Sequence, residues 1–123
     1  LRDVNVALSL HGQWLPLDPP FASEATIGGI LATNDSGPLR HRYGTPRDLV
    51  IGTEIATADG ILAKSGGQVV KNVAGYDLSK LLAGSFGSLA AIVNVTFKLS
   101  PLHRERWSPL RATPRSWLVS SAR

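Results

Sequence analysis

Two stretches rich in β-branched and apolar residues predict the strands of this chain. Leu49–Thr57 is followed by the connection Ala58-Asp59-Gly60 and then by a second short apolar run, Ile61–Ala63. This order is typical of a β-hairpin. Leu89–Leu99 alternates β-branched, apolar and polar residues, and this pattern predicts one more half-buried strand.

Apolar residues at helical spacing predict two short helices. Leu1–His11 carries apolar residues four positions apart and is followed by Gly12, where a helix would stop. Asp77 is a good N-cap for a second helix over 78–82, and Gly84 fits its end. The alternative for Asp77 is a charged group oriented at a ligand pocket.

Proline and glycine shape the chain between these elements. Gln13–Leu17 could form a strand, and the prolines that follow predict an extended loop ending near Phe21. The pair Gly28-Gly29 is expected to turn the backbone sharply before a buried turn of helix. Asn34–Pro38 reads as a turn.

Strands separated by short helices, with a hairpin in place of uniform crossovers, favour an α+β fold over a doubly wound parallel sheet. We therefore expect a mainly antiparallel sheet with short flanking helices.

Composition narrows the class of protein. The chain has 123 residues, of which 43% are hydrophobic, and this is the size of one soluble domain without a transmembrane segment. It has no cysteine, which excludes disulfides, thiolate metal sites and iron–sulfur ligation, and we expect a cytoplasmic protein. The chain starts at Leu1 without a signal peptide, and we expect a fragment or a processed chain.

The positive charge lies at one end. Eight basic and eight acidic residues balance between Leu1 and Leu99, and the net charge of +4 comes from the arginines of 102–123. We expect this basic segment to be a flexible or foreign tail. Trp107 and Trp117 could stack on bases, but no nucleic-acid reader motif accompanies them, so nucleic acid is not an expected partner.

The high number of glycines is the feature of the sequence that points to a bound ligand. A pair such as Gly28-Gly29 can expose backbone N–H groups to a phosphate or pyrophosphate, although glycines that merely serve turns explain the same letters. Neither the dinucleotide-binding nor the P-loop glycine motif is complete. His11, His41 and His103 are far apart without carboxylates at ligand spacing, so no metal site is expected.

The order of several motifs identifies a family. Three of them resemble the FAD-binding domain of the vanillyl-alcohol oxidase family: Leu15–Pro20, Ala25–Gly29 and Tyr43–Asp48. Gly67–Leu78 and Gly84–Leu89 are similar to its 2-hydroxyacid oxidase branch. Within that branch, Gly37–Arg40 and Lys71–Leu78 are most similar to the FAD-binding subunit of bacterial glycolate oxidase. The resemblance covers about Leu8–Leu99.

The resemblance implies a site and a division of the chain. The family's FAD domain has two α+β subdomains, and it implies that residues 1–101 are part of the second, with 102–123 outside it. It implies noncovalent FAD and contacts from nine residues. These are Pro19, Thr26, Gly28, Gly29, Ala32, Thr33, Asn34, Gly37 and Ile92. No catalytic role is carried over to Lys71, Asn72 or Asp77.

The function that the resemblance implies is part of a flavin-dependent 2-hydroxyacid oxidoreductase, inactive alone, that oxidises glycolate to glyoxylate. Its implied partners are other subunits of a glycolate oxidase complex, an iron–sulfur subunit included, which could hold it at the periphery of the inner membrane. The alternative is a noncatalytic accessory or subunit-docking domain. Ala90-Ala91 favours that alternative, because the family often has glycine and a hydrophobic residue there, and an added Cβ could loosen the cofactor's fit.

Overall fold

The computed structural model describes residues 1–67 and 77–102. Lys71, Asn72 and most of the basic tail therefore lie outside the described residues.

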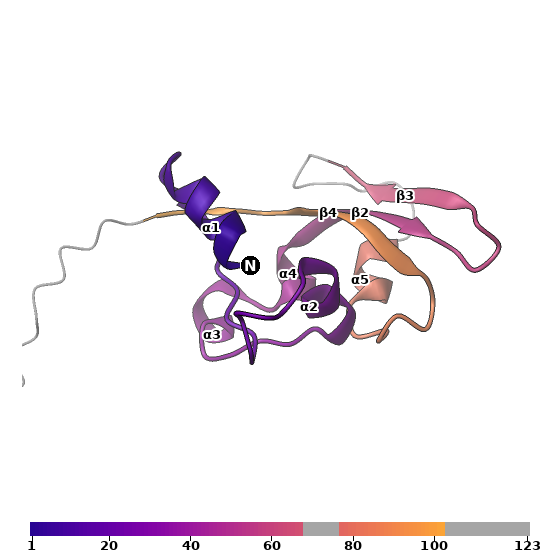
Figure 1. Ribbon diagram of the computed structural model, residues 1–123, viewed down its shortest axis with the longest axis horizontal. Helices are drawn as coiled ribbons and strands as arrows, with labels where there is room; N and C mark the ends of the chain where they lie inside the picture. Colours follow the sequence, from indigo (N-terminus) through magenta and orange to yellow (C-terminus); the bar gives the residue numbers. More distant parts are fainter. Residues whose placement is uncertain (68–76, 103–123) are drawn as a thin grey trace, which may run out of the picture.

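A three-stranded antiparallel sheet forms the centre of the fold (Figure 1). Its strands are β2 (Val50–Ala56), β3 (Leu62–Gly66) and β4 (Ala91–Phe97), in the order β3-β2-β4. The hairpin and the third strand are confirmed, and with them the α+β class. Pairing between β2 and β4 shifts register twice, once between Val50 and Gly52 and once between Glu54 and Ile55.

Short helices cover one side of this sheet (Figure 1). They are α2 (Ile27–Thr33), α4 (Pro46–Leu49) and α5 (Leu78–Leu82). The side chain of Asp77 accepts a hydrogen bond from the Lys80 N–H, so the predicted N-cap of α5 is confirmed. Leu82 of α5 packs with Ile55 and Ala90 in a small buried cluster beneath the sheet.

A second, two-stranded sheet stands at the other end of the molecule. β1 (Gln13–Trp14) pairs antiparallel with β5 (Ser100–Pro101), beside α1 (Arg2–Ser9). The helix predicted at the start of the chain is confirmed. The main buried cluster contains Leu15, Leu17, Ile30 and Leu49, and Leu8 of α1 packs against it.

The prediction of a strand over Gln13–Leu17 was too long. Pairing ends at Trp14 because Pro16 has no N–H to donate to a neighbouring strand. Leu17 instead donates its N–H to the carbonyl of Leu15, which turns the chain inward. Leu15, Pro16 and Leu17 are consequently buried as a core segment without regular structure.

The expected sharp turn at Gly28-Gly29 was also wrong. Both glycines lie in the first turn of α2, and neither has a positive φ. The helix begins one residue earlier than the glycines suggest because Thr26 caps it: its hydroxyl accepts a hydrogen bond from the Gly29 N–H at 3.0 Å.

Two further helices were not predicted: α3 (Arg40–Tyr43) and α4, each of four residues. Their length is too short for an apolar period to be visible. α4 nevertheless has a local signal, because Thr45, Pro46 and Asp48 form a capping box with proline at the first helical position. Hydrogen bonds from the backbone and hydroxyl of Thr45 lower the pKa of Asp48.

Candidate functional site

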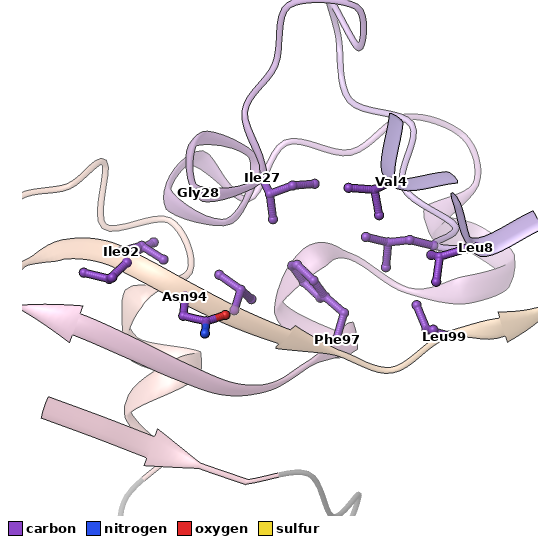
Figure 2. A pocket seen from close by; sticks show the side chains of 11 residues that line it. Val4, Leu8, Ile27, Gly28, Ile92, Asn94, Phe97 and Leu99 are labelled. Atoms are coloured by element: carbon purple, nitrogen blue, oxygen red, sulfur yellow. The ribbon is translucent and has the colours of Figure 1, made fainter. Parts of the chain in front are cut away.

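A cavity of about 390 Å³ lies between α1, α2 and β4, and we call it the edge groove (Figure 2). Figure 2 shows Ile27 and Val4 on one side of this space and Phe97 on the other. The lining residues are Val4, Leu8, Leu15, Ile27, Gly28, Ile92, Val93, Asn94, Val95, Phe97 and Leu99. Apart from the Asn94 amide, their side chains are apolar or absent, which suits the face of a flat ring.

The edge groove runs along the free edge of β4. Four consecutive residues, Ile92–Val95, line it, and the register shift between Asn94 and Ile92 interrupts the usual alternation of side chains there. Among the described residues, none of β2 lines the groove, so the groove lies on the side of β4 that faces away from β2. β4 pairs with β2 on one side only, so within the described residues its other edge has unpaired backbone N–H and C=O groups. These groups can bind the polar rim of a ring.

The start of α2 adds hydrogen-bond donors at one end of the groove. Thr26 satisfies the N–H of Gly29, while in the described structure the N–H groups of Ile27 and Gly28 have no protein acceptor. Gly28 has no side chain to cover them. A Cβ on Gly28 would lie 3.8 Å from the Cβ of Ile92, so these two predicted site residues are neighbours in the lining of the groove.

Three predicted site residues lie at the opposite end of α2. The Thr33 hydroxyl donates to the Gly29 carbonyl at 3.0 Å, and the Ala32 carbonyl accepts the N–H of Phe86 at 2.8 Å. Asn34 has a left-handed backbone with φ of 57°, and its side-chain oxygen accepts the N–H of Arg47. The polar groups named here are engaged within the protein, and none of the three residues lines the edge groove.

Pro19 and Gly37 meet each other through Asp18. The Asp18 carboxylate accepts the N–H groups of Gly37 and Leu39, each at 2.9 Å. The Gly37 N–H is therefore already satisfied by the protein. Pro19 follows Asp18 directly and is buried, and neither Pro19 nor Gly37 lines the edge groove.

Sequence reasoning missed two features of this region. Local patterns place Val4 and Leu8 in a helix and Phe97 and Leu99 in a strand, but nothing local indicates that residues so far apart in the chain line one cavity. Asp18 stands in the sequence only as part of a motif. Its place between the apolar residues Leu17 and Pro19 is the available signal, since a carboxylate that is buried there must find donors.

The structure also places Ala90 and Ala91. Ala90 is 8% exposed as a residue and packs with Ile55 and Leu82, and it does not line the edge groove. Ala91 is exposed and does not line the groove either. The methyl groups of this pair therefore do not obstruct the edge groove.

The comparison with protein families decides the identity of the fold. The family model described as an FAD binding domain matches residues 1–66, which include α1, α2 and the whole of β2. The chain belongs to the FAD-binding domain family.

Relatives of this FAD-binding domain are similar over most of the chain. The glycolate oxidase subunit GlcE of Escherichia coli (strain K12) is 45% identical over 105 residues, which is 85% of this chain and 30% of GlcE. The D-lactate dehydrogenase of Archaeoglobus fulgidus is 41% identical over 105 residues, 85% of this chain and 24% of the enzyme. The chain thus spans less than a third of the length of these relatives.

A solved structure of alkyldihydroxyacetonephosphate synthase has the same fold. It superimposes with a TM-score of 0.69 at 26% identity and covers 84% of this chain and 18% of the synthase. No helix within residues 1–67 and 77–102 is long and apolar enough to cross a membrane.

The edge groove fits a part of FAD, the cofactor of this family. Its apolar wall suits a ring system, and the open N–H groups of Ile27 and Gly28 suit a phosphate oxygen. About 390 Å³ is near the lower limit of ligand sites, so the groove has room for only part of a dinucleotide. The lining residues include no histidine, cysteine or tyrosine, the side chains that could take a covalent bond to a flavin.

Proposed function

We propose that this chain holds FAD noncovalently in the edge groove and forms part of a flavin-dependent 2-hydroxyacid oxidoreductase. One observation carries the proposal: the side-chain-free start of α2 lies beside the unpaired edge of β4, with an apolar wall opposite. This arrangement offers donors, backbone polar groups and a flat apolar surface to one extended ligand.

Each part of the chain has a defined task in this proposal. The N–H groups of Ile27 and Gly28 bind a phosphate oxygen, and the free edge of β4 binds the rim of a ring. Val4 and Leu8 of α1 exclude water from that ring. When FAD is bound, the flavin supplies the chemistry, because it accepts a hydride equivalent from the substrate.

We propose glycolate as the substrate and glyoxylate as its product. The support is the similarity to GlcE, which is named as a glycolate oxidase subunit, over 85% of this chain. The D-lactate dehydrogenase supports the wider class, since lactate is also a 2-hydroxy acid. The residues that line the edge groove include no basic side chain that could bind a substrate carboxylate, so we expect the chain to be inactive as an oxidase by itself.

The proposed partners are the other subunits of a glycolate oxidase complex, an iron–sulfur subunit included. The support is that GlcE is named as a subunit. In this proposal residues 1–101 are the second subdomain of the FAD domain, and residues 102–123 lie outside it. The proposed location is the cytoplasm or, through the partners, the periphery of the inner membrane.

A calorimetric titration of the full chain with FAD tests the cofactor proposal, with FMN and ADP as comparison ligands. We expect saturable binding of FAD, which is weak because the groove encloses only part of the cofactor. ADP should compete with FAD if the groove holds the adenine half, and FMN should compete if it holds the flavin half. Absence of heat with all three ligands would overturn FAD binding by this chain. It would favour an accessory domain that keeps the flavoprotein fold and docks on another subunit.

A further inference from the structure

Asp18 joins the two chain segments on either side of α2. Its Oδ1 accepts the Gly37 N–H and its Oδ2 accepts the Leu39 N–H, both at 2.9 Å and both partly buried. Each carboxylate oxygen therefore receives one backbone donor in a charge-assisted hydrogen bond, the stronger kind in proteins.

The contact between the segments is tight as well as polar. A Cβ on Gly37 would lie 2.5 Å from the Asp18 Oδ2 and 2.6 Å from the Asp18 carbonyl oxygen. No side chain fits between them, so glycine at position 37 is a condition of the carboxylate's approach. The segments before and after α2 are thus in backbone contact at this point.

The backbone at Asp18 is held in place by its buried neighbours. Leu17 and Pro19 on either side of it are buried, and Leu17 belongs to the main core cluster. The bond to Gly37 spans 19 positions and closes the segment that contains the Thr26 cap and all of α2. Ile30 of α2 belongs to the same core cluster as Leu17, so the closed segment is also anchored to the core within α2.

We propose that Asp18 is a positioning residue for the cofactor: by tying the chain before α2 to the chain after it, Asp18 fixes Ile27 and Gly28, which line the edge groove, against β4. This inference rests on the proposed function. It reassigns Gly37, whose N–H faces the carboxylate, to the support of the groove. Asp18 acts through α2 and does not line the groove.

The test compares FAD affinity in three variants of the full chain, followed by quenching of flavin fluorescence at a temperature well below every melting transition. Asp18→Ala removes both acceptors. Asp18→Asn keeps one acceptor for the Gly37 N–H but turns an N–H group toward Leu39. The matched control is Asp48→Asn, because the Asp48 Oδ2 also accepts two hydrogen bonds, from the N–H and hydroxyl of Thr45, but in α4.

We expect the Kd for FAD to rise at least about tenfold in Asp18→Ala. Loss of a hydrogen bond to a charged group shifts the equilibrium between the ordered and displaced positions of α2 by about that factor, and only the ordered position binds FAD. Asp18→Asn should fall between Asp18→Ala and the parent chain. Asp48→Asn should bind FAD like the parent chain even though its melting temperature is lower. A loss of FAD affinity in Asp18→Ala, together with a lower melting temperature but unchanged FAD affinity in Asp48→Asn, would show that Asp18 positions the site and does more than stabilise the fold.

Three outcomes would overturn the inference. If Asp18→Ala binds FAD as tightly as the parent chain, Asp18 does not position the site, while the proposed function stands. If Asp18→Ala and Asp48→Asn lose affinity equally, the loss reflects stability alone. If the parent chain binds no FAD, the proposed function fails, and a cofactor role for Asp18 in this chain fails with it.

Discussion

Gly28 and Gly37 are both predicted site residues, but the structure gives them different reasons to lack a side chain. At Gly28 a Cβ would meet only Ile92, at an ordinary 3.8 Å, so the fold itself tolerates alanine there. At Gly37 a Cβ would meet the carboxylate and backbone of Asp18 well inside contact distance. Gly28 therefore leaves room for a ligand, and Gly37 leaves room for the protein.

Gly28→Ala should separate binding from folding. Alanine is favoured over glycine in a helix by about 0.5–1 kcal/mol, so the urea midpoint should stay or rise. The new methyl group points at the groove wall beside Ile92, and we expect roughly tenfold weaker FAD binding from a misfit of 1–3 kcal/mol. Unchanged FAD affinity in a well-folded Gly28→Ala chain would show that the ligand does not approach this backbone.

Gly37→Ala should act on folding instead. We expect a loss of about 1–3 kcal/mol in the free energy of unfolding, measured by urea denaturation, because the added atom overpacks the contact with Asp18. Removing the carboxylate as well, in Asp18→Ala/Gly37→Ala, should not restore stability, since the Asp18 carbonyl oxygen remains 2.6 Å away. Parent-like stability of Gly37→Ala would contradict this packing.

At the scale of elements, short helices are held to the sheet by a few specific contacts. The hydroxyls of Thr53 on β2 and Ser79 on α5 are both buried and lie 3.2 Å apart. The ammonium group of Lys80 donates to the carbonyls of Arg47 and Val50, which ties α5 to the end of α4. Helices of four or five residues cannot be stable alone, so such contacts determine where they form.

The hydroxyl pair predicts a non-additive double-mutant cycle. Ser79→Ala leaves the Thr53 hydroxyl buried without its partner, and we expect a loss of about 1–3 kcal/mol in the free energy of unfolding. Thr53→Val/Ser79→Ala removes both polar groups and should lose less than the sum of the single changes. Strict additivity in urea denaturation would indicate that the two hydroxyls do not interact.

The capping box of α4 predicts a pH dependence. Hydrogen bonds from Thr45 lower the pKa of Asp48 below its ordinary value of 3.8. The folded state therefore favours the carboxylate, so its stabilising contribution is present above that value and is lost as pH falls through the lower, folded-state pKa. We expect the capping box to be worth about 1 kcal/mol at neutral pH.

Thermal melts between about pH 6 and pH 2 check this sign. The advantage of the parent chain over Asp48→Asn should shrink toward the acidic end. Asp59, whose pKa is lowered by the Thr57 hydroxyl, contributes equally in both chains and cancels in the comparison. A constant difference in melting temperature across the range would contradict a contribution from ionised Asp48.

For the molecule as a whole, local patterns predicted the elements better than the site. The β2–β3 hairpin and the Asp77 cap were readable because their signals lie within a few neighbouring residues. α2 was misjudged at Gly28-Gly29, because the Thr26 cap outweighed the glycines' freedom to turn. The edge groove could not be predicted from the sequence, because Val4 and Phe97 come to line one cavity only after the whole chain has folded.

The predicted site residues divide in the same way. Gly28 and Ile92 line the edge groove, and Thr26 caps α2, the helix that contains Gly28. Pro19 and Gly37 lie outside the groove lining, and Gly37 donates its N–H to Asp18, a residue that the motif resemblance did not single out. Whether each residue touches FAD stays a prediction.

Amide chemical shifts of an isotope-labelled chain, followed by NMR as FAD is added, test the location of the cofactor most directly. The largest shifts should fall on Ile27, Gly28 and Ile92–Val95, which line the edge groove. Residues of β3, which β2 separates from β4, should not respond, Lys64 among them. Shifts centred on β3, or no shifts at saturating FAD, would contradict cofactor binding in the edge groove.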